Sequence, residues 1–393
     1  MLTFTCMTHA KHALWVAAAA TLFAVGTACS MDGESAMLAD GSRGPSGPPG
    51  EGRDPPASGG DAPGAPTATG VVIVHSAAFP PFRLCFENSL DLVPQPDSKI
   101  MPQANVVGVE VGSVVRIDPL AAPGKVYVIH ERAVRFQPNV TCRELLGGGT
   151  AGLILNGAYH EANRIDTPLG QDRVQVLALT GCGGGPFIEA VGATSDSCGP
   201  DWDVTSGNLF ANVIDLPTTP QGATETSIPV QLVNLAPAIQ AQLGSATLEV
   251  TFGDLSTAGK LPTTVASRPP LLEPSQQVNL NVDQTDIQVY GTHGFRIEAV
   301  EDGGAPKFSF SQSLAAVQDL SSPTDIPTTY YRVASNYALL LTGDPSVPAT
   351  LDDGAPNPDR RRVQLLAVPV LDPATIDAGA DAAPSTGDDD GGT

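Results

Sequence analysis

The stretch that decides the fold reads VIVHS at residues 72–76, and it returns in altered form as QLVNL at residues 231–235. Further blocks follow in the same order in each half of the chain. GKVYVI (124–129) parallels GFRIEA (294–299), GLILNG (152–157) parallels ALLLTG (338–343), and RVQVLAL (173–179) parallels RVQLLAV (362–368). Ordered self-similarity of this kind indicates a duplicated structural unit. We therefore predict two similar domains, residues 71–215 and 216–370.

Each block is a short run rich in Val, Ile, Leu or Tyr and bounded by Gly, Pro or Asp. Such runs are typical of strands separated by turns. VGVEV (107–111) and TLEVTF (247–252) alternate as half-buried strands do. Helical turns are favoured only in short stretches such as residues 142–146 and 236–242. The pattern predicts an all-β fold with two β-sandwiches in tandem.

The opening strands also resemble a known family. VVIVHSA (71–77) and VQLVNLAP (230–237) are similar to the R-V-V-H-A-S-P-like start of a bacterial domain of unknown function, which occurs in tandem in secreted and surface lipoproteins. The chain departs from that pattern at residues 78–80, where AFP replaces the usual Pro-Asp-Ala-Pro, and at Asn234, which stands where the first copy has His75. The resemblance implies immunoglobulin-like sandwiches, and it supplies no catalytic residues.

The N-terminus is typical of an exported protein. An apolar run over residues 13–25 ends in GTACS (26–30), which resembles a bacterial lipobox although Gly26 stands where Leu is usual. Ordinary cleavage after Ala28 would leave five cysteines, one of them unpaired, whereas lipidation of Cys29 leaves four for pairing. We predict a signal peptide at residues 1–28 and a lipid on Cys29, with plain secretion as the alternative. Ser30 after the cysteine resembles outer-membrane sorting.

Two tails lack the composition of a folded core. Residues 29–70 are rich in Pro, Gly, Ala and Ser without periodicity, and residues 371–393 end in STGDDDGGT. Such segments bury too little apolar surface to offset chain entropy. We predict a disordered tether at the N-terminal side and a disordered acidic tail at the C-terminus.

Four cysteines remain for pairing: Cys85, Cys142, Cys182 and Cys198. Three pairings are possible. Cys182 and Cys198 bracket a loop directly after a strand, which favours a local bridge and leaves Cys85 with Cys142, all in an oxidising compartment. A zinc site is the alternative, but the sequence has no Cys-x-x-Cys or paired His spacing.

Charge and motifs narrow the function. With 42 acidic and 20 basic residues, the net charge of −22 argues against a nucleic-acid partner. The sequence carries no recognised catalytic motif. We interpret His75 as a satisfied strand residue, and His130 and His160 as exposed residues at a strand end and after a turn. A hydrolase with a scattered site near these histidines is the alternative.

Two acidic loops are candidates for calcium. Asp196, Asp201 and Asp203 flank Cys198, and Asp352 and Asp353 precede Asn357 and Asp359. Neither has EF-hand spacing, and ordinary turn chemistry explains both loops equally well. Beside the first loop, Trp202 is either a stacking platform for a sugar or a residue packed against the disulfide.

From these observations we expect a non-catalytic outer-membrane lipoprotein without a cofactor. It would bind an envelope protein or a polysaccharide through loops at the ends of the sandwiches. A structural envelope component without a ligand is a further alternative.

Overall fold

Strands dominate the fold, as the sequence predicts. The computed structural model describes residues 69–91, 109–134, 139–146, 159–185, 198, 201–217, 226–283, 285–301, 304–317, 330–331, 336–352, 355 and 357–370. These residues form four β-sheets with a few short helices, which confirms the all-β class. All of them belong to one compact unit, Gly60–Thr393. The predicted signal peptide, Cys29, the tether and the acidic tail lie outside the described residues, except for the last two residues of the tether.

Residues 70–215, here called the first half, supply two sheets. The four-stranded sheet has the order β3-β1-β6-β7, and the three-stranded sheet has the order β2-β4-β5. The strands are β1 (Gly70–His75), β2 (Phe82–Phe86), β3 (Val114–Ile117), β4 (Gly124–His130), β5 (Tyr159–Ile165), β6 (Val174–Thr180) and β7 (Phe210–Asp215). The short helices are η1 (Glu87–Ser89), α1 (Glu131–Val134) and α2 (Cys142–Leu146).

Residues 227–370, the second half, supply the other two sheets. Their orders are β11-β8-β14-β15 and β10-β9-β12-β13. The strands are β8 (Ser227–Asn234), β9 (Thr247–Asp254), β10 (Thr263–Ser267), β11 (Val278–Asn281), β12 (His293–Val300), β13 (Phe308–Ser313), β14 (Asn336–Thr342) and β15 (Gln364–Val370). The described helices are α4 (Pro237–Leu243), α5 (Val289–Thr292) and η2 (Leu314–Ala316).

Both halves repeat one topology. In each, the opening strand pairs in parallel with the sixth of seven matched strands: β1 with β6, and β8 with β14. This topology aligns β4 with β12, as the sequence blocks predict. It also aligns β6 with β14, so LALTG (177–181) corresponds to LLLTG (339–343). The sequence match of residues 173–179 with residues 362–368 is therefore wrong, because β15 is an edge strand equivalent to β7. The match of residues 152–157 with residues 338–343 is also wrong, because residues 338–342 belong to β14, the equivalent of β6; residues 152–157 lie outside the described residues.

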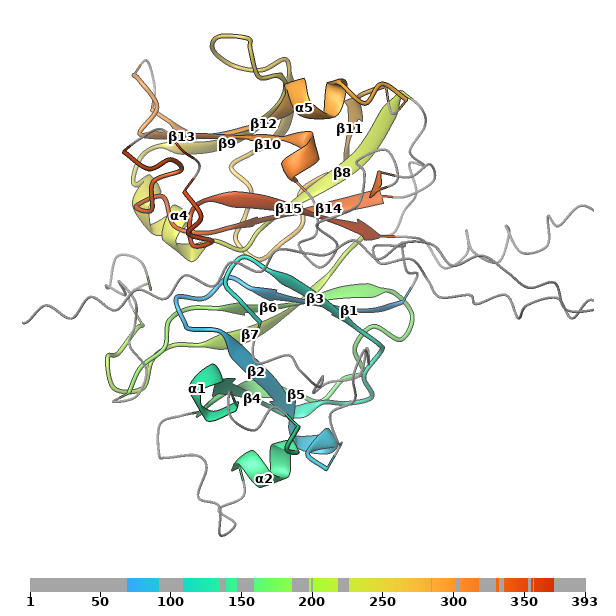
Figure 1. Ribbon diagram of the computed structural model, residues 1–393, viewed down its shortest axis with the longest axis vertical. Coiled ribbons are helices and arrows are strands. Elements are labelled where there is room, and N and C mark those ends of the chain that lie inside the picture. The colour runs from blue at the N-terminus through green and yellow to red at the C-terminus, as the bar shows by residue number, and fades with distance from the viewer. Residues whose placement is uncertain are drawn as a thin grey trace, which may run out of the picture. The chain divides into compact units, whose positions relative to one another are not determined.

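The four sheets stack in layers through three apolar cores (Figure 1). Alternate residues of the four-stranded sheets face opposite ways: Val71 and Ile73 enter the core of the first half, whereas Val72 and Val74 join a core shared with the second half. Strands covered on both faces read as continuous apolar runs rather than alternating ones. Across this shared core, Ser76 Oγ donates to Leu235 O at 2.5 Å.

A side-chain amide closes each sandwich along one edge. Asn163 of β5 exchanges two hydrogen bonds with the backbone of Ala211 in β7, at 3.1 and 2.9 Å. Gln312 of β13 makes the same pair of bonds to Leu365 in β15, at 3.0 and 2.8 Å. Ala211 and Leu365 hold equivalent positions in the two topologies. Each amide therefore satisfies backbone groups that an edge strand would otherwise leave unpaired.

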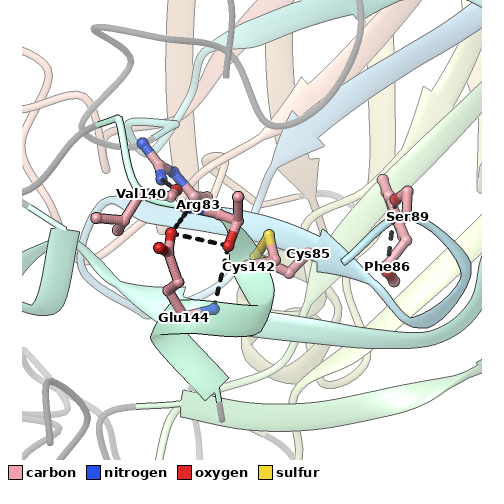
Figure 2. Close-up of a disulfide and its surroundings, with 8 residues drawn as sticks. Arg83, Cys85, Phe86, Ser89, Val140, Cys142 and Glu144 are labelled. Carbon is pink, nitrogen blue, oxygen red and sulfur yellow. Dashed lines mark hydrogen bonds between the residues drawn. A yellow bond between two sulfur atoms is a disulfide. The ribbon is translucent and has the colours of Figure 1, made fainter. Parts of the chain in front are cut away.

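Both disulfides join the cysteines that the sequence paired. Cys85 of β2 bonds to Cys142 at the start of α2, and Cys182 bonds to Cys198. Figure 2 shows the first bridge beside Arg83, whose Nη1 donates to Val140 O at 3.3 Å. Thr141 and Glu144 exchange hydrogen bonds in a capping box at the start of α2. Bridge and cap together fix α2 over the outer face of the three-stranded sheet.

Candidate functional site

A groove opens between the halves where β1, β6, β8 and β14 end. One part of it has a volume of about 100 Å³ and a second part has a volume of about 320 Å³, and the two parts share Ala78, Val111 and Arg361. We call it the inter-half groove and define it by the residues that line it: Ser76, Ala77, Ala78, Phe79, Pro80, Pro81, Glu110, Val111, Gly181, Pro237, Ala238, Gly343, Asp344, Ser346, Val347, Asp359, Arg360 and Arg361.

Two equivalent glycines line the groove. Gly181 follows β6 with φ of 86°, and Gly343 follows β14 with φ of 103°. A Cβ on Gly181 would lie 2.3 Å from Asn208 O, and one on Gly343 would lie 2.2 Å from Arg362 O. Any side chain at either position would collide with backbone and adopt an unfavourable conformation. Glycine is thus required at both strand ends, because neighbouring backbone passes close to each of them.

The rim of the groove carries paired charges. Arg361 forms a forked ion pair with Asp359, through bonds of 3.0 and 2.5 Å, which lowers the pKa of Asp359 and raises that of Arg361. Arg360 of the second half bonds to Glu110 of the first half at 2.6 Å. Asp344 Oδ1 accepts from Ser346 N at 2.8 Å and from Gln242 Nε2 at 3.0 Å. These side chains are held in fixed positions around an apolar floor.

His75 braces the loop that forms one wall of the groove. Its Nδ1 accepts from Ala77 N at 3.3 Å, so its Nε2 carries the proton and donates to Phe79 O at 2.9 Å. Burial lowers the pKa of the ring from 6.5 to about 4. Both ring nitrogens are engaged with backbone, which agrees with the interpretation of His75 as a satisfied strand residue. In the second half, Asn234 Oδ1 accepts from Ala236 N at 3.1 Å in the same way.

The other two candidate histidines gather near Phe79. Ring centroids lie 6.0 Å apart for Phe79 and His130, and 5.9 Å apart for Phe79 and His160. The expectation that both are exposed is wrong: His130 is buried, and His160 is half-buried, with a pKa lowered by burial. The reason is that both lie within strands, β4 and β5, that face the core. Among the described residues, no group of three or more His, Cys, Asp or Glu side chains could hold a metal ion.

The acidic loops show turn chemistry where they are described. Asp203 Oδ1 accepts from Thr205 N at 2.9 Å and Ser206 N at 3.0 Å, and these bonds lower its pKa. Asp201 and Asp352 are exposed, and Asp196 and Asp353 lie outside the described residues.

Trp202 is half-buried, and its Nε1 donates to Gly183 O at 3.0 Å, one residue from the disulfide-bonded Cys182. This contact favours the packing interpretation of Trp202 over a free stacking platform.

Apart from Asp359, the residues that line the groove were not among the sequence candidates. Asp344 and Arg361 stand in loops that look like ordinary turns, and nothing in their spacing connects them to residues 76–81. The Leu-Thr-Gly repeat was the available signal, because it marks equivalent strand ends. Correct alignment of β6 with β14 would have placed both glycines at one site.

Within the described residues, no helix has the length and apolar character that a bilayer crossing requires. Compared with known proteins, the chain matches no family model, and no curated protein is similar enough to count as a relative.

Proposed function

We propose that this chain is a non-catalytic binding protein of a bacterial cell envelope. It is held at the outer membrane by a lipid on Cys29 and consists of two tandem immunoglobulin-like sandwiches on a flexible tether. The lipobox-like GTACS (26–30), the odd cysteine and the low-complexity segment at residues 29–70 support the anchor and tether. Two sets of sheets with one topology support the tandem sandwiches.

The observation that carries the binding role is the inter-half groove. Ala78, Pro80, Pro81 and Val111 give it an apolar floor, and the fixed ion pairs surround that floor. An apolar centre with a polar rim is the usual anatomy of a protein-binding surface. The described groove residues include one aromatic side chain, Phe79, and it is only 3% exposed. Because sugar rings are commonly held by stacking on exposed aromatics, we favour an extended segment of an envelope protein over a polysaccharide.

The bonding of His75 supports a role without catalysis for this histidine. A general base needs a nitrogen that is free to take a proton from the substrate. His75 uses both nitrogens in holding its own loop. The carboxylates of Asp359 and Glu110 in the groove are paired with arginines. A protein that presents surface requires neither a free base nor an unpaired acid.

Site-directed crosslinking tests this proposal. The chain from Ser30 to Thr393 contains the whole described unit, and a photoreactive amino acid at Ser346 would lie on the groove rim. We expect illumination with envelope extract to give one discrete protein adduct, which Val347→Glu in the groove abolishes. Leu351→Glu is the matched control, because Leu351 is 44% exposed and does not line the groove. Loss of the adduct in both variants or in neither would refute the groove as the binding site, and repeating the experiment with a chelator reports on calcium.

A further inference from the structure

A second cavity lies within the second half and shares no residue with the inter-half groove. It has a volume of about 500 Å³ and lies between the end of α4, the start of β9 and the loop after β10. Leu243, Ala246, Leu248 and Leu271 give it apolar walls together with two prolines. Volumes of this order are typical of pockets that hold small organic molecules.

The loop after β10, which lines one side of this cavity, has an uncommon backbone conformation. Arg268 has a φ of 53°, in the left-handed region that side-chain-bearing residues rarely adopt. Its backbone N–H donates to Leu248 O at 2.9 Å, and Pro269 and Pro270 follow it directly. The prolines on one side and the backbone bond on the other restrain the loop, so the backbone of Arg268 is held beside the cavity that this residue lines.

The Arg268 guanidinium has few partners among the described residues. Its Nε donates to Thr247 Oγ1 at 3.2 Å, and this is the one side-chain bond of Arg268 among the described residues. Five other described cations of the second half have a carboxylate or carbonyl partner: Lys260, Arg296, Arg360, Arg361 and Arg362. Arg268 is exposed and forms no ion pair with a described carboxylate, so its guanidinium is free to bind an anion.

A second cation lies close to the same cavity. A Cβ on Gly244 would lie 3.6 Å from Lys307 Nζ, and both chain neighbours of Gly244 line the cavity. Within the described residues, Lys307 Nζ has no carboxylate partner. The cavity lining itself contains no Asp or Glu. The cavity therefore combines apolar walls with one cation in its lining, Arg268, and a second nearby, Lys307, and neither forms an ion pair with a described carboxylate.

We propose that this cavity binds an organic anion with an apolar body, whose charged group pairs with Arg268 and is attracted by the nearby Lys307. The guanidinium fork recognises a planar or tetrahedral oxyanion, and a charge-assisted bond there would replace hydrating water. The body of the ligand would lie against Leu243, Leu271 and the prolines. This site is separate from the groove of the proposed function, and each can fail without the other.

Fluorescence titration of the chain from Ser30 to Thr393 with 8-anilinonaphthalene-1-sulfonate tests the proposal, because this dye is an anion with an apolar body. N-phenyl-1-naphthylamine, which lacks the sulfonate, is the matched neutral probe. We expect the anionic dye to bind and Arg268→Gly to weaken it about tenfold, which corresponds to one charge-assisted bond. Glycine suits the backbone at this position, so the variant keeps its fold. Lys307→Gln should weaken binding less, because Lys307 does not line the cavity.

Two further variants test whether the dye binds at this cavity or elsewhere on the protein. Arg173→Gln removes one exposed charge from the first half, and Arg361→Gln removes one from the inter-half groove. Neither is expected to change binding of the anionic dye, and added salt is expected to weaken it. Equal binding of the dye to the Arg268→Gly variant and the unchanged chain would overturn the proposal. A loss caused by Arg361→Gln would overturn it as well, because it would place the dye in the groove.

Discussion

Replacing His75 by Asn is expected to remove one contribution to the acid sensitivity of this fold. The buried ring has its pKa lowered from 6.5 to about 4, while in the unfolded chain it titrates near its ordinary value. Between these two values the unfolded chain binds a proton that the folded chain does not. The stability tied to His75 is therefore fully present above about pH 6.5 and is lost as the pH falls toward about 4. At about 1.4 kcal/mol for each pKa unit, the loss amounts to roughly 3 kcal/mol.

Asn is the replacement of choice because the second half already uses it. Asn234 makes the same bond to the backbone N–H two residues on, and it does not titrate. Near neutral pH the variant should be less stable by about 1 kcal/mol, since the bond from His75 Nε2 to Phe79 O is lost. This deficit should shrink and then reverse as the pH falls, because the variant has no ring to protonate.

Urea denaturation of both chains near pH 7.5 and near pH 4.5 measures this effect. The fold also loses stability in acid as carboxylates with a lowered pKa, such as Asp203 and Asp254, become protonated. They are present in both chains, so the difference in unfolding free energy between the chains isolates His75. A difference that stays constant across the two pH values would refute the assignment of His75 as a buried neutral brace.

Other features of the fold give three more predictions. Asn163→Leu and Gln312→Leu should each lower the unfolding free energy by about 2 kcal/mol in urea denaturation, because each removes two hydrogen bonds worth about 1 kcal/mol apiece. Gln276→Leu, at an exposed position, is the control. Unchanged unfolding midpoints for both Asn163→Leu and Gln312→Leu would contradict the role given to the two amides. Arg268→Gly should raise the unfolding free energy by about 1 kcal/mol, because glycine adopts a positive φ without strain. A lower midpoint of thermal unfolding in this variant would contradict backbone strain at Arg268. Cys29→Ala should move the protein from the membrane fraction to the soluble fraction, and its retention in the membrane would contradict the lipid anchor.

Local sequence patterns predicted many of the strands. The strand expected at residues 107–111 is wrong where it is described, because Val109 forms only an isolated bridge with Phe82 and Glu110 and Val111 belong to no strand. Gly-bounded apolar runs such as residues 124–129 and 294–299 became β4 and β12, because strand propensity and turn chemistry act over a few residues. The short helices α2 and α4 were predicted within one residue at each end. Loop length also favoured the Cys182–Cys198 pair, since the cysteines nearest in sequence had the shortest loop to close.

The arrangement of the sheets was harder to predict. β6 and β15 share the pattern R-V-Q followed by apolar residues, yet β6 is central and β15 is an edge strand. The two sequences are similar because both strands are buried on both faces and therefore consist mainly of apolar residues. This similarity does not show that the two strands hold equivalent positions in the two halves. His130 and His160 were misjudged for a related reason: a polar side chain next to a turn looks exposed until a neighbouring sheet covers it. Such coverage is a property of tertiary structure that no local window contains.

The core shared by the two halves has a practical consequence for dissecting the protein. Val72, Val74 and Val176 on one side meet Leu340, Leu366 and Val368 on the other. A fragment that stopped after Asp215 would expose this whole apolar face to water. Self-association of the fragment would bury that face again and lower the free energy, so the fragment should aggregate. Activities assigned to a lone half would then belong to an aggregate, so the smallest piece fit for biochemistry keeps both β1 and β15.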